Sequence, residues 1–302
     1  MIKNGLTLDQ SNFLLAVEAG ENLTAGNAVY IGSDGKAYKT KADDMTKVDF
    51  KGFVRETVST GVTAYIVHSL HADGFTSLTA GAIYYLSTTA GEITTTATNF
   101  KKAVGVAIGT TIIKIIDVPY TRIVKFTSSG TWTKYAGLKE AEIIAIGAGA
   151  GGGRWSSSNN DNQAAGGGPG GISIKFVTAS DLSSTETITV GTGGNGQTGA
   201  PAAGNGGTTS FGSLAIATGG NGADQLVPGS SGIGTTGDVL LQGGHSEPYS
   251  SSDSYGGVGI LGRGGRNSYS PYGDGGTGGT DSGSATDGNA GQDGIVIVIE
   301  KY

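Results

Sequence analysis

The stretch Glu142-Ile-Ile-Ala-Ile-Gly-Ala-Gly-Ala-Gly-Gly-Gly153 decides the fold of the second half of this chain. Residues 142–146 are dominated by isoleucine, which is typical of a buried β-strand. The residues that follow carry almost no side chain, and glycine chains of this kind form extended threefold helices that pack closely and exchange interchain hydrogen bonds. The stretch therefore predicts a strand that runs into an ordered glycine tract.

Similar tracts recur through the second half of the chain. Of the 302 residues 57 are glycine, about two and a half times the usual share of roughly 7%. Residues 1–125 hold 12 of these glycines and residues 126–302 hold 45. The alternative is a flexible linker rich in glycine and serine. The ordered structure is favoured because strands are expected at both ends of the tracts, including 295–299, and they confine the chain between them.

The first half contains an internal repeat. Leu23-Thr-Ala-Gly-Asn-Ala-Val-Tyr-Ile31 returns 55 residues later as Leu78-Thr-Ala-Gly-Ala-Ile-Tyr-Tyr-Leu86. Each copy predicts a turn before a strand, in which Gly26 and Gly81 supply a positive φ. Short strands and hairpin turns follow each copy, and two such halves predict a pseudo-twofold small β-barrel.

The composition supports an all-β protein, because Leu, Met, Lys and Glu are scarce while Thr, Ser and Gly dominate. We predict an N-terminal β-barrel domain over residues 1–120 and a C-terminal glycine-rich β-sandwich with polyglycine-type loops over residues 121–302. Residues 119–125 are predicted to connect them. Trp132 is expected in the core of the second domain, beneath Ile144, Ile146, Ile297 and Val298.

Several classes of protein are disfavoured by composition. The chain has no cysteine, so disulfide frameworks and thiolate metal sites are excluded. The net charge is −6 and no run of Lys or Arg is present, which disfavours nucleic acid as a partner. No window reaches the roughly 18 apolar residues of a membrane span, so no membrane insertion is predicted.

Two motifs that would carry chemistry do not fit their context. Gly147, Gly149 and Gly152 match the G-x-G-x-x-G letters of a dinucleotide site, but that site needs a helix at its third glycine, and residues 154–163 favour none. Asp281, Asp287 and Asp293 stand six residues apart, yet the strict register of a calcium β-roll is not met. We therefore predict no cofactor and no metal.

The histidines and serines offer no catalytic arrangement either. His68 and His71, three residues apart on an extended chain, point to opposite faces, and the remaining histidine is His245. No serine lies in a nucleophile elbow, and no carboxylate pair has the context of a glycosidase. We predict that the protein is not an enzyme.

Three loops combine aromatic residues with Asn, Ser or Asp: 154–163, 245–255 and 263–274. Recognition surfaces use this mixture, because aromatic rings give large contact area and short polar side chains give hydrogen bonds. The alternative is ordinary polar loops. The hypothesis of a receptor-binding surface, with its side chains exposed, rests on Trp155, Tyr249, Tyr255, Tyr269 and Tyr272.

Two resemblances to known families extend this interpretation. Residues 15–117 resemble a small β-domain that recurs in structural proteins of tailed bacteriophages, through Ala19-Gly-Glu-Asn-Leu-Thr-Ala-Gly-Asn-Ala-Val-Tyr-Ile31 and Gly74-Phe-Thr-Ser-Leu-Thr-Ala-Gly-Ala-Ile-Tyr-Tyr-Leu-Ser87. A looser similarity exists to the compact β-barrels of phage head-decoration domains.

Residues 124–302 resemble the glycine-rich domain at the ends of phage tail-fibre proteins. The matching segments are Phe126-Thr-Ser-Ser-Gly-Thr-Trp132, Ile143 to Gly153, Thr187-Ile-Thr-Val-Gly-Thr-Gly-Gly194, Gly206-Gly-Thr-Thr-Ser-Phe-Gly212 and Gly294-Ile-Val-Ile-Val298. Tyr135 departs from the family, which more often has proline there.

The resemblances imply a non-enzymatic bacteriophage virion protein, assembled in the host cytoplasm. We expect a tail-fibre or tail-tip protein that recognises a glycan or protein of the host surface, with a capsid head-decoration or head-fibre protein as the alternative. Residues 1–120 are expected to bind other virion proteins. A homotrimer is expected.

Overall fold

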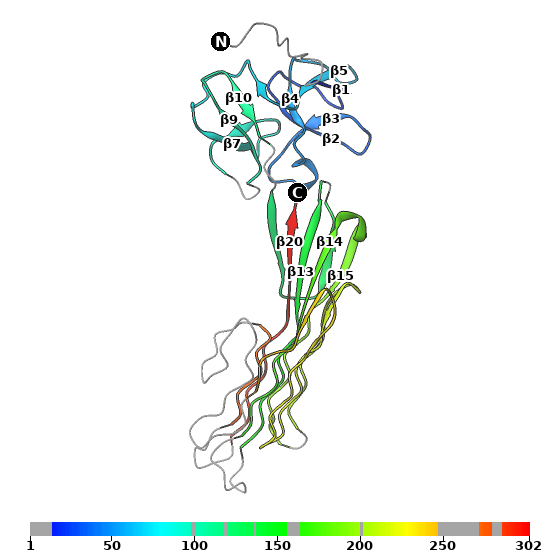
Figure 1. The fold of residues 1–302 in the computed structure, drawn as a ribbon, viewed down its shortest axis with the longest axis vertical. Helices are drawn as coiled ribbons and strands as arrows, with labels where there is room; N and C mark the ends of the chain where they lie inside the picture. The colour runs from blue at the N-terminus through cyan, green and yellow to red at the C-terminus, as the bar shows by residue number, and fades with distance from the viewer. Residues whose placement is uncertain are drawn as a thin grey trace, which may run out of the picture. The chain divides into compact units, whose positions relative to one another are not determined.

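The computed structural model describes residues 14–97, 101–116, 120–135, 137–155, 164–199, 202–246, 272–279 and 286–302 (Figure 1). These residues form four antiparallel five-stranded sheets and no α-helix, which confirms the predicted all-β class. The chain divides into two compact units. The first holds residues 1–121, 135–137 and 301–302, and the second holds residues 122–134 and 138–300.

The first unit contains two sheets of short strands. In chain order its elements are β1 (Leu14–Glu18), β2 (Ala28–Ile31), β3 (Ala37–Lys39), the 3₁₀ turn η2 (Met45–Lys47), β4 (Gly52–Val54), β5 (Thr63–Val67), β6 (His71–Ala72), β7 (Ile83–Leu86), β8 (Ile93–Thr94), β9 (Ala103–Ala107) and β10 (Ile113–Ile115).

The sequence repeat gives two sheets of the same strand order. The first is β1-β5-β4-β2-β3 and the second is β6-β10-β9-β7-β8, so each strand of one copy has its counterpart at the same place in the other. The turns before β2 and β7 hold Gly26 at φ +84° and Gly81 at φ +81°, as predicted. The predicted barrel is wrong, because both sheets stay open. The edge strands β6 and β8 have two residues each, too few to carry the ladder that would close a barrel.

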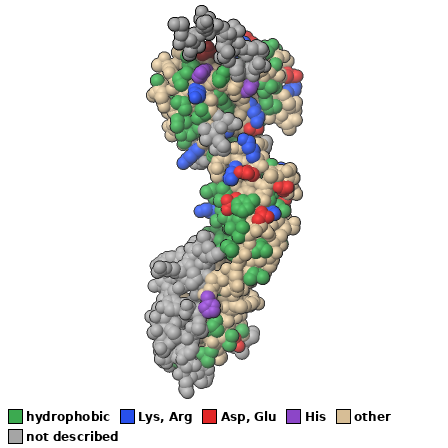
Figure 2. All heavy atoms as spheres, in the orientation of Figure 1, with side chains coloured by type: hydrophobic (Ala, Val, Ile, Leu, Met, Phe, Trp, Pro, Cys, Tyr) green, Lys and Arg blue, Asp and Glu red, His purple; other side chains and the backbone are tan. Residues whose placement is uncertain are grey.

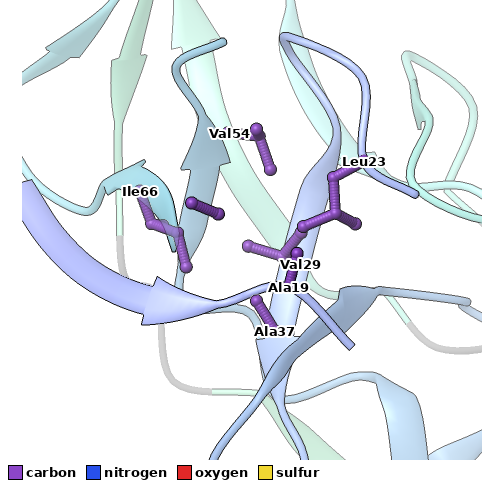
Figure 3. Close-up of a cluster of buried hydrophobic side chains, with 7 residues drawn as sticks. Ala19, Leu23, Val29, Ala37, Val54 and Ile66 are labelled. Atoms are coloured by element: carbon purple, nitrogen blue, oxygen red, sulfur yellow. The ribbon is translucent and has the colours of Figure 1, made fainter. Parts of the chain in front are cut away.

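The core of the first unit is made of small and medium aliphatic side chains. Figure 3 shows the cluster, in which Leu23, Val29 and Ile66 converge from different elements. Aromatic rings join the two repeats, because the Phe53 ring lies 5.0 Å from that of Phe50 and 5.1 Å from that of Phe75. The two halves of the repeat therefore share one core.

The second unit is a sandwich of two sheets. Its elements are β11 (Thr121–Phe126), β12 (Gly130–Thr133), β13 (Glu140–Ile146), β14 (Ile172–Thr178), the 3₁₀ turn η3 (Ala179–Asp181), β15 (Thr185–Thr189), β16 (Thr209–Phe211), β17 (Ala215–Ala217), β18 (Gly234–Thr236), β19 (Val239–Leu241) and β20 (Ile295–Lys301). One sheet has the order β11-β20-β13-β14-β19, and the other has the order β12-β15-β16-β17-β18. The predicted connector over residues 119–125 is wrong from Thr121 onward, because those residues form the edge strand β11.

The two sheets pack around Trp132, which is 2% exposed. Its ring lies 5.4 Å from that of Phe211, and its indole N–H donates to the buried Glu300 carboxylate at 2.7 Å. Arg122 contacts the other oxygen of Glu300 at 3.1 Å, so the buried charge is paired. The core position of Trp132 is confirmed. Its predicted contacts with Ile144, Ile146 and Ile297 are wrong, because these residues form a cluster on the opposite face of the sheet.

Candidate functional site

The glycine tract of residues 147–155 is the axis of a bundle. Its backbone N–H groups donate to three neighbouring tracts in turn, with a period of three residues: Ala148 to Gly207 O at 3.1 Å, Gly149 to Gln292 O at 2.8 Å and Ala150 to Gly168 O at 2.8 Å. The same order repeats over Gly151, Gly152 and Gly153. This is the period of an extended threefold helix.

The carbonyl groups of the central tract accept from three further tracts with the same period. Gly220 N donates to Ala148 O at 3.0 Å, Gly194 N to Gly149 O at 2.9 Å and Gly276 N to Ala150 O at 2.7 Å. Backbone hydrogen bonds also join each outer tract to the next around the ring. The central tract is therefore enclosed by six others: 164–171, 191–197, 203–207, 218–225, 273–279 and 286–294.

Glycine is required because the tracts lie too close for side chains. A Cβ at Gly149 would lie 1.8 Å from Asp274 O, and one at Gly151 would lie 1.9 Å from Asn195 O. The N–H groups of Gly147, Gly149 and Gly152 all donate to neighbouring carbonyls, so they are not offered to a phosphate. The tracts therefore form a hydrogen-bonded lattice and not the flexible linker that was the alternative interpretation.

The lattice gathers the tract ends at one end of the bundle, which we call the distal end. The tract 147–155 continues β13 and 164–171 enters β14, while 191–197 follows β15 and 203–207 enters β16. In the same way 218–225 follows β17, and 286–294 enters β20. Figure 1 shows these tracts as extended segments that run side by side away from the strands. The chain therefore turns back at the distal end several times.

A polar cluster holds the distal end together. The side-chain oxygen of Gln197 accepts from Arg154 N at 2.9 Å and from Gln225 N at 3.2 Å, and Gln197 is 4% exposed. Arg154 Nε lies 3.1 Å from the Asp287 carboxylate. One buried amide thus ties together three tracts where the backbone lattice ends.

The turn from Asp224 to Val227 presents apolar side chains next to this cluster. Asp224 and Val227 exchange backbone hydrogen bonds of 3.0 and 2.6 Å, which fixes a tight turn. Leu226 is 40% exposed and Val227 is 64% exposed. The distal end therefore combines exposed aliphatic side chains with the exposed carboxylate of Asp287.

Of the predicted receptor-binding residues the structure describes Trp155 and Tyr272, and these two do not lie together as an exposed group. Trp155 is 5% exposed, and its backbone pairs with Thr286 through hydrogen bonds of 2.9 and 3.2 Å. Tyr272 packs against the Ile146, Ile172 and Ile295 cluster, at the other end of the bundle. At about 3.1 Å per residue the two aromatic residues are separated by roughly 28 Å. The expected exposure of Trp155 is wrong, and Tyr249, Tyr255 and Tyr269 lie outside the described residues.

The two described members of the aspartate series act within the bundle. Asp287 pairs with Arg154, and the Asp293 carboxylate accepts from Gly193 N at 2.7 Å. Asp281 lies outside the described residues. Across the part of the chain that the structure describes, His, Asp and Glu side chains form no group of three suited to a metal. The described residues also contain no helix long and apolar enough to cross a membrane.

Sequence reasoning missed Gln197 and the Asp224–Val227 turn. The signal for Gln197 is its spacing, because it follows Gly191 and Gly194 at intervals of three, and all three residues are buried. Trp155 has the same signal, since it continues the series of Gly149 and Gly152, which face the tract 286–294. No comparable spacing marks Leu226 and Val227.

Fold and site together define an all-β, glycine-rich domain whose body is a polyglycine lattice and whose turns lie at one end. Comparison with family models agrees, because the glycine-rich domain model matches residues 125–294. The chain belongs to this glycine-rich domain family. A search of curated proteins finds no match for the chain.

Proposed function

We propose that this protein is a non-enzymatic bacteriophage virion surface protein, placed at a tail fibre or tail tip, and that the distal end of its bundle recognises the host surface. Residues 1–120 would attach it to other virion proteins. The observation that carries the proposal is the placement of the turns. Before Arg154 the central tract carries no side chain larger than the methyl groups of Ala148 and Ala150, so larger and polar side chains lie at the outer positions and where the tracts turn back.

The described distal residues suit a recognition surface. Leu226 and Val227 offer exposed apolar area at the end of the tract 218–225, Asp287 offers an exposed carboxylate on the tract 286–294, and the Gln197 amide holds the tracts of Arg154 and Gln225 in register. Aliphatic or aromatic anchors within a polar rim carry most of the energy in many interfaces. A rigid lattice also reduces the entropy that such a surface loses on binding.

Adsorption tests this proposal. The double variant Leu226→Ser/Val227→Ser removes apolar groups from the distal end, and the triple variant Tyr249→Ser/Tyr255→Ser/Tyr269→Ser changes the predicted receptor-binding residues that lie outside the described part of the chain. We expect at least one of them to reduce binding of the purified protein to the bacterium that propagates the phage by about tenfold or more, as for hot-spot residues. Val62→Ser/Ile108→Ser changes two residues of similar exposure in the first unit and should bind like wild type.

Melting curves and microscopy separate the outcomes. Both variants should melt like wild type, so that a loss of binding reports recognition. Wild-type binding by both variants would contradict the proposal. Antibody labelling of virions against residues 121–302 then locates the chain, and a label on the capsid would favour the head-decoration alternative.

A further inference from the structure

One face of the sheet β11-β20-β13-β14-β19 is apolar and faces away from the Trp132 core. The strand register places Ile144 opposite Ile174 and Glu142 opposite Phe176, while Ile174 is also opposite Val239. In β20, Ile297 packs against the Ile146 cluster, and Ile299 shares its face by the alternation of the strand. Ile123 lies on this face too, because its neighbour Arg122 points to Glu300 on the other.

Among the residues that the structure describes, cover is found at the end of this face beside the bundle. There Tyr272 packs over Ile146, Ile172 and Ile295. Farther along the strands Ile123 is 60% exposed and Phe176 is 56% exposed. Figure 2 shows hydrophobic side chains at the surface over β13 and β20, next to charged ones. We define the isoleucine face as three exposed and four half-buried residues of this face: Ile123, Phe176 and Val239, and Ile144, Ile174, Ile297 and Ile299.

The isoleucine face has the size and chemistry of a protein interface. Its side chains expose on the order of 500 Å², which matches the largest patch on an ordinary monomer and is often functional. Two such faces packed together would bury roughly 1,000 Å², the lower bound for a specific interface. The aliphatic side chains stand at period two on a sheet, the arrangement that packs against another sheet in a sandwich.

The charges on the face favour a second copy of this chain as the partner. Lys125 shares the face of Ile123 by alternation and is exposed, and Glu142 lies opposite Phe176 on the same face. By the same alternation Glu140 and Lys301 also lie on this face, so it carries charges of both signs and offers partners for both when it meets its own copy. Self-complementarity of this kind is what a symmetric interface requires.

We propose that the isoleucine face is the self-association surface of the protein, buried against the same face of further copies. This self-association proposal goes beyond the proposed host recognition, since it concerns a different surface and does not depend on the distal end. Two such faces packed together close as a twofold dimer of about 60 kDa. The homotrimer expected from the sequence, of about 90 kDa, would need three copies of this face around a threefold axis.

Light scattering of the full chain at micromolar concentration tests the proposal. Wild type should be oligomeric, and Ile123→Lys/Phe176→Lys should lower the mass to that of the 30.1 kDa monomer. Both side chains are more than half exposed, so the monomer should keep the wild-type circular dichroism spectrum. Val62→Lys/Ile108→Lys places the same charges on exposed residues of the first unit and should leave the mass unchanged.

Disulfide trapping identifies the surface directly, because the chain has no cysteine of its own. Ile123→Cys/Phe176→Cys puts thiols on strands three apart in the sheet, roughly 14 Å from each other, too far for a bond within one chain. Oxidation should give covalent multimers, whereas Val62→Cys/Ile108→Cys should not. A wild-type monomer at every concentration, or an oligomer that the lysine variant leaves intact, would overturn the proposal. Host-cell binding by the distal-end variants is a separate readout, so the two proposals can fail independently.

Discussion

Placing a single methyl group on the central tract, by Gly151→Ala, tests whether the glycine tracts form a lattice. The added Cβ would lie 1.9 Å from Asn195 O, a separation that real structures do not show. The tracts must therefore move apart by more than 1 Å. Both backbone groups of Gly151 are bonded at that point, its N–H to Gly204 O at 2.9 Å and its carbonyl to Ala223 N at 3.1 Å.

The cost follows from these two bonds. Both bonds run to tracts other than that of Asn195, so a shift of the central tract away from Asn195 distorts them, and each buried group left unsatisfied costs about 1–3 kcal/mol. We expect Gly151→Ala to lower the free energy of unfolding of the second unit by about 3–5 kcal/mol. For a domain of this size about 1 kcal/mol shifts Tm by roughly 2–4 °C, so the melting temperature should fall by about 10 °C.

Differential scanning calorimetry of the full chain measures this shift. Gly130→Ala is the matched control, because Gly130 lies in β12 of the same unit and an added Cβ meets no atom within 4 Å. It should melt at or slightly above the wild-type temperature, since alanine reduces the entropy of the unfolded chain. If Gly151→Ala melted together with Gly130→Ala, the tracts would behave as a linker and the lattice argument would be refuted.

Two further predictions concern the sandwich. Trp132→Ala should cost roughly 3–5 kcal/mol, the range for a buried aromatic residue, and a melt within a degree or two of wild type would contradict its core position. The hydrogen bond from Lys175 at 2.6 Å lowers the pKa of Asp238 in the folded state, so this carboxylate stabilises the fold above the unfolded pKa of about 4 and the effect is lost as pH falls through the folded value. Between pH 5 and pH 3 the Tm of wild type should therefore fall more than that of Asp238→Asn, and equal slopes would argue against the pairing.

Local patterns were sufficient to predict the strands and the repeat. Their isoleucine and valine content predicts that the segments Ile143 to Ile146 and Ile295 to Ile299 are buried strands. The repeated Leu-Thr-Ala-Gly motif predicts the turns at Gly26 and Gly81. Closure of the first unit was predicted wrongly, because the pairing of sheet edges depends on strand length in the folded molecule. The strands β6 and β8 have only two residues each, too few for the sequence pattern to predict where each strand ends and whether the sheet closes.

The distal end was only partly predictable. The aromatic character of Trp155 suggested an exposed loop residue, but its spacing of three from Gly152 places it on the lattice, where it is buried. The spacing of three predicts burial of Trp155 only when it is known that the tract 286–294 lies against this side of the central tract. The packing of Tyr272 was not predictable for a similar reason, because its partners Ile146 and Ile295 lie far from it in the chain.

The two proposed surfaces follow from one physical constraint. In the bundle, the N–H and carbonyl groups of the central tract are used by its neighbours, and its interior holds no side chain larger than the methyl groups of Ala148 and Ala150, so larger side chains are confined to the ends and the outer positions. In the sheets, by contrast, side chains cannot be avoided on either face, because successive residues of a strand point to opposite faces. One face of β11-β20-β13-β14-β19 packs on the Trp132 core, so the remaining side chains stand on the other face. Variation at the distal turns leaves the lattice unchanged, whereas a charge on the isoleucine face alters a surface that no described segment covers beyond Tyr272. Changes that affect host binding and changes that affect assembly should therefore fall in separate parts of the chain.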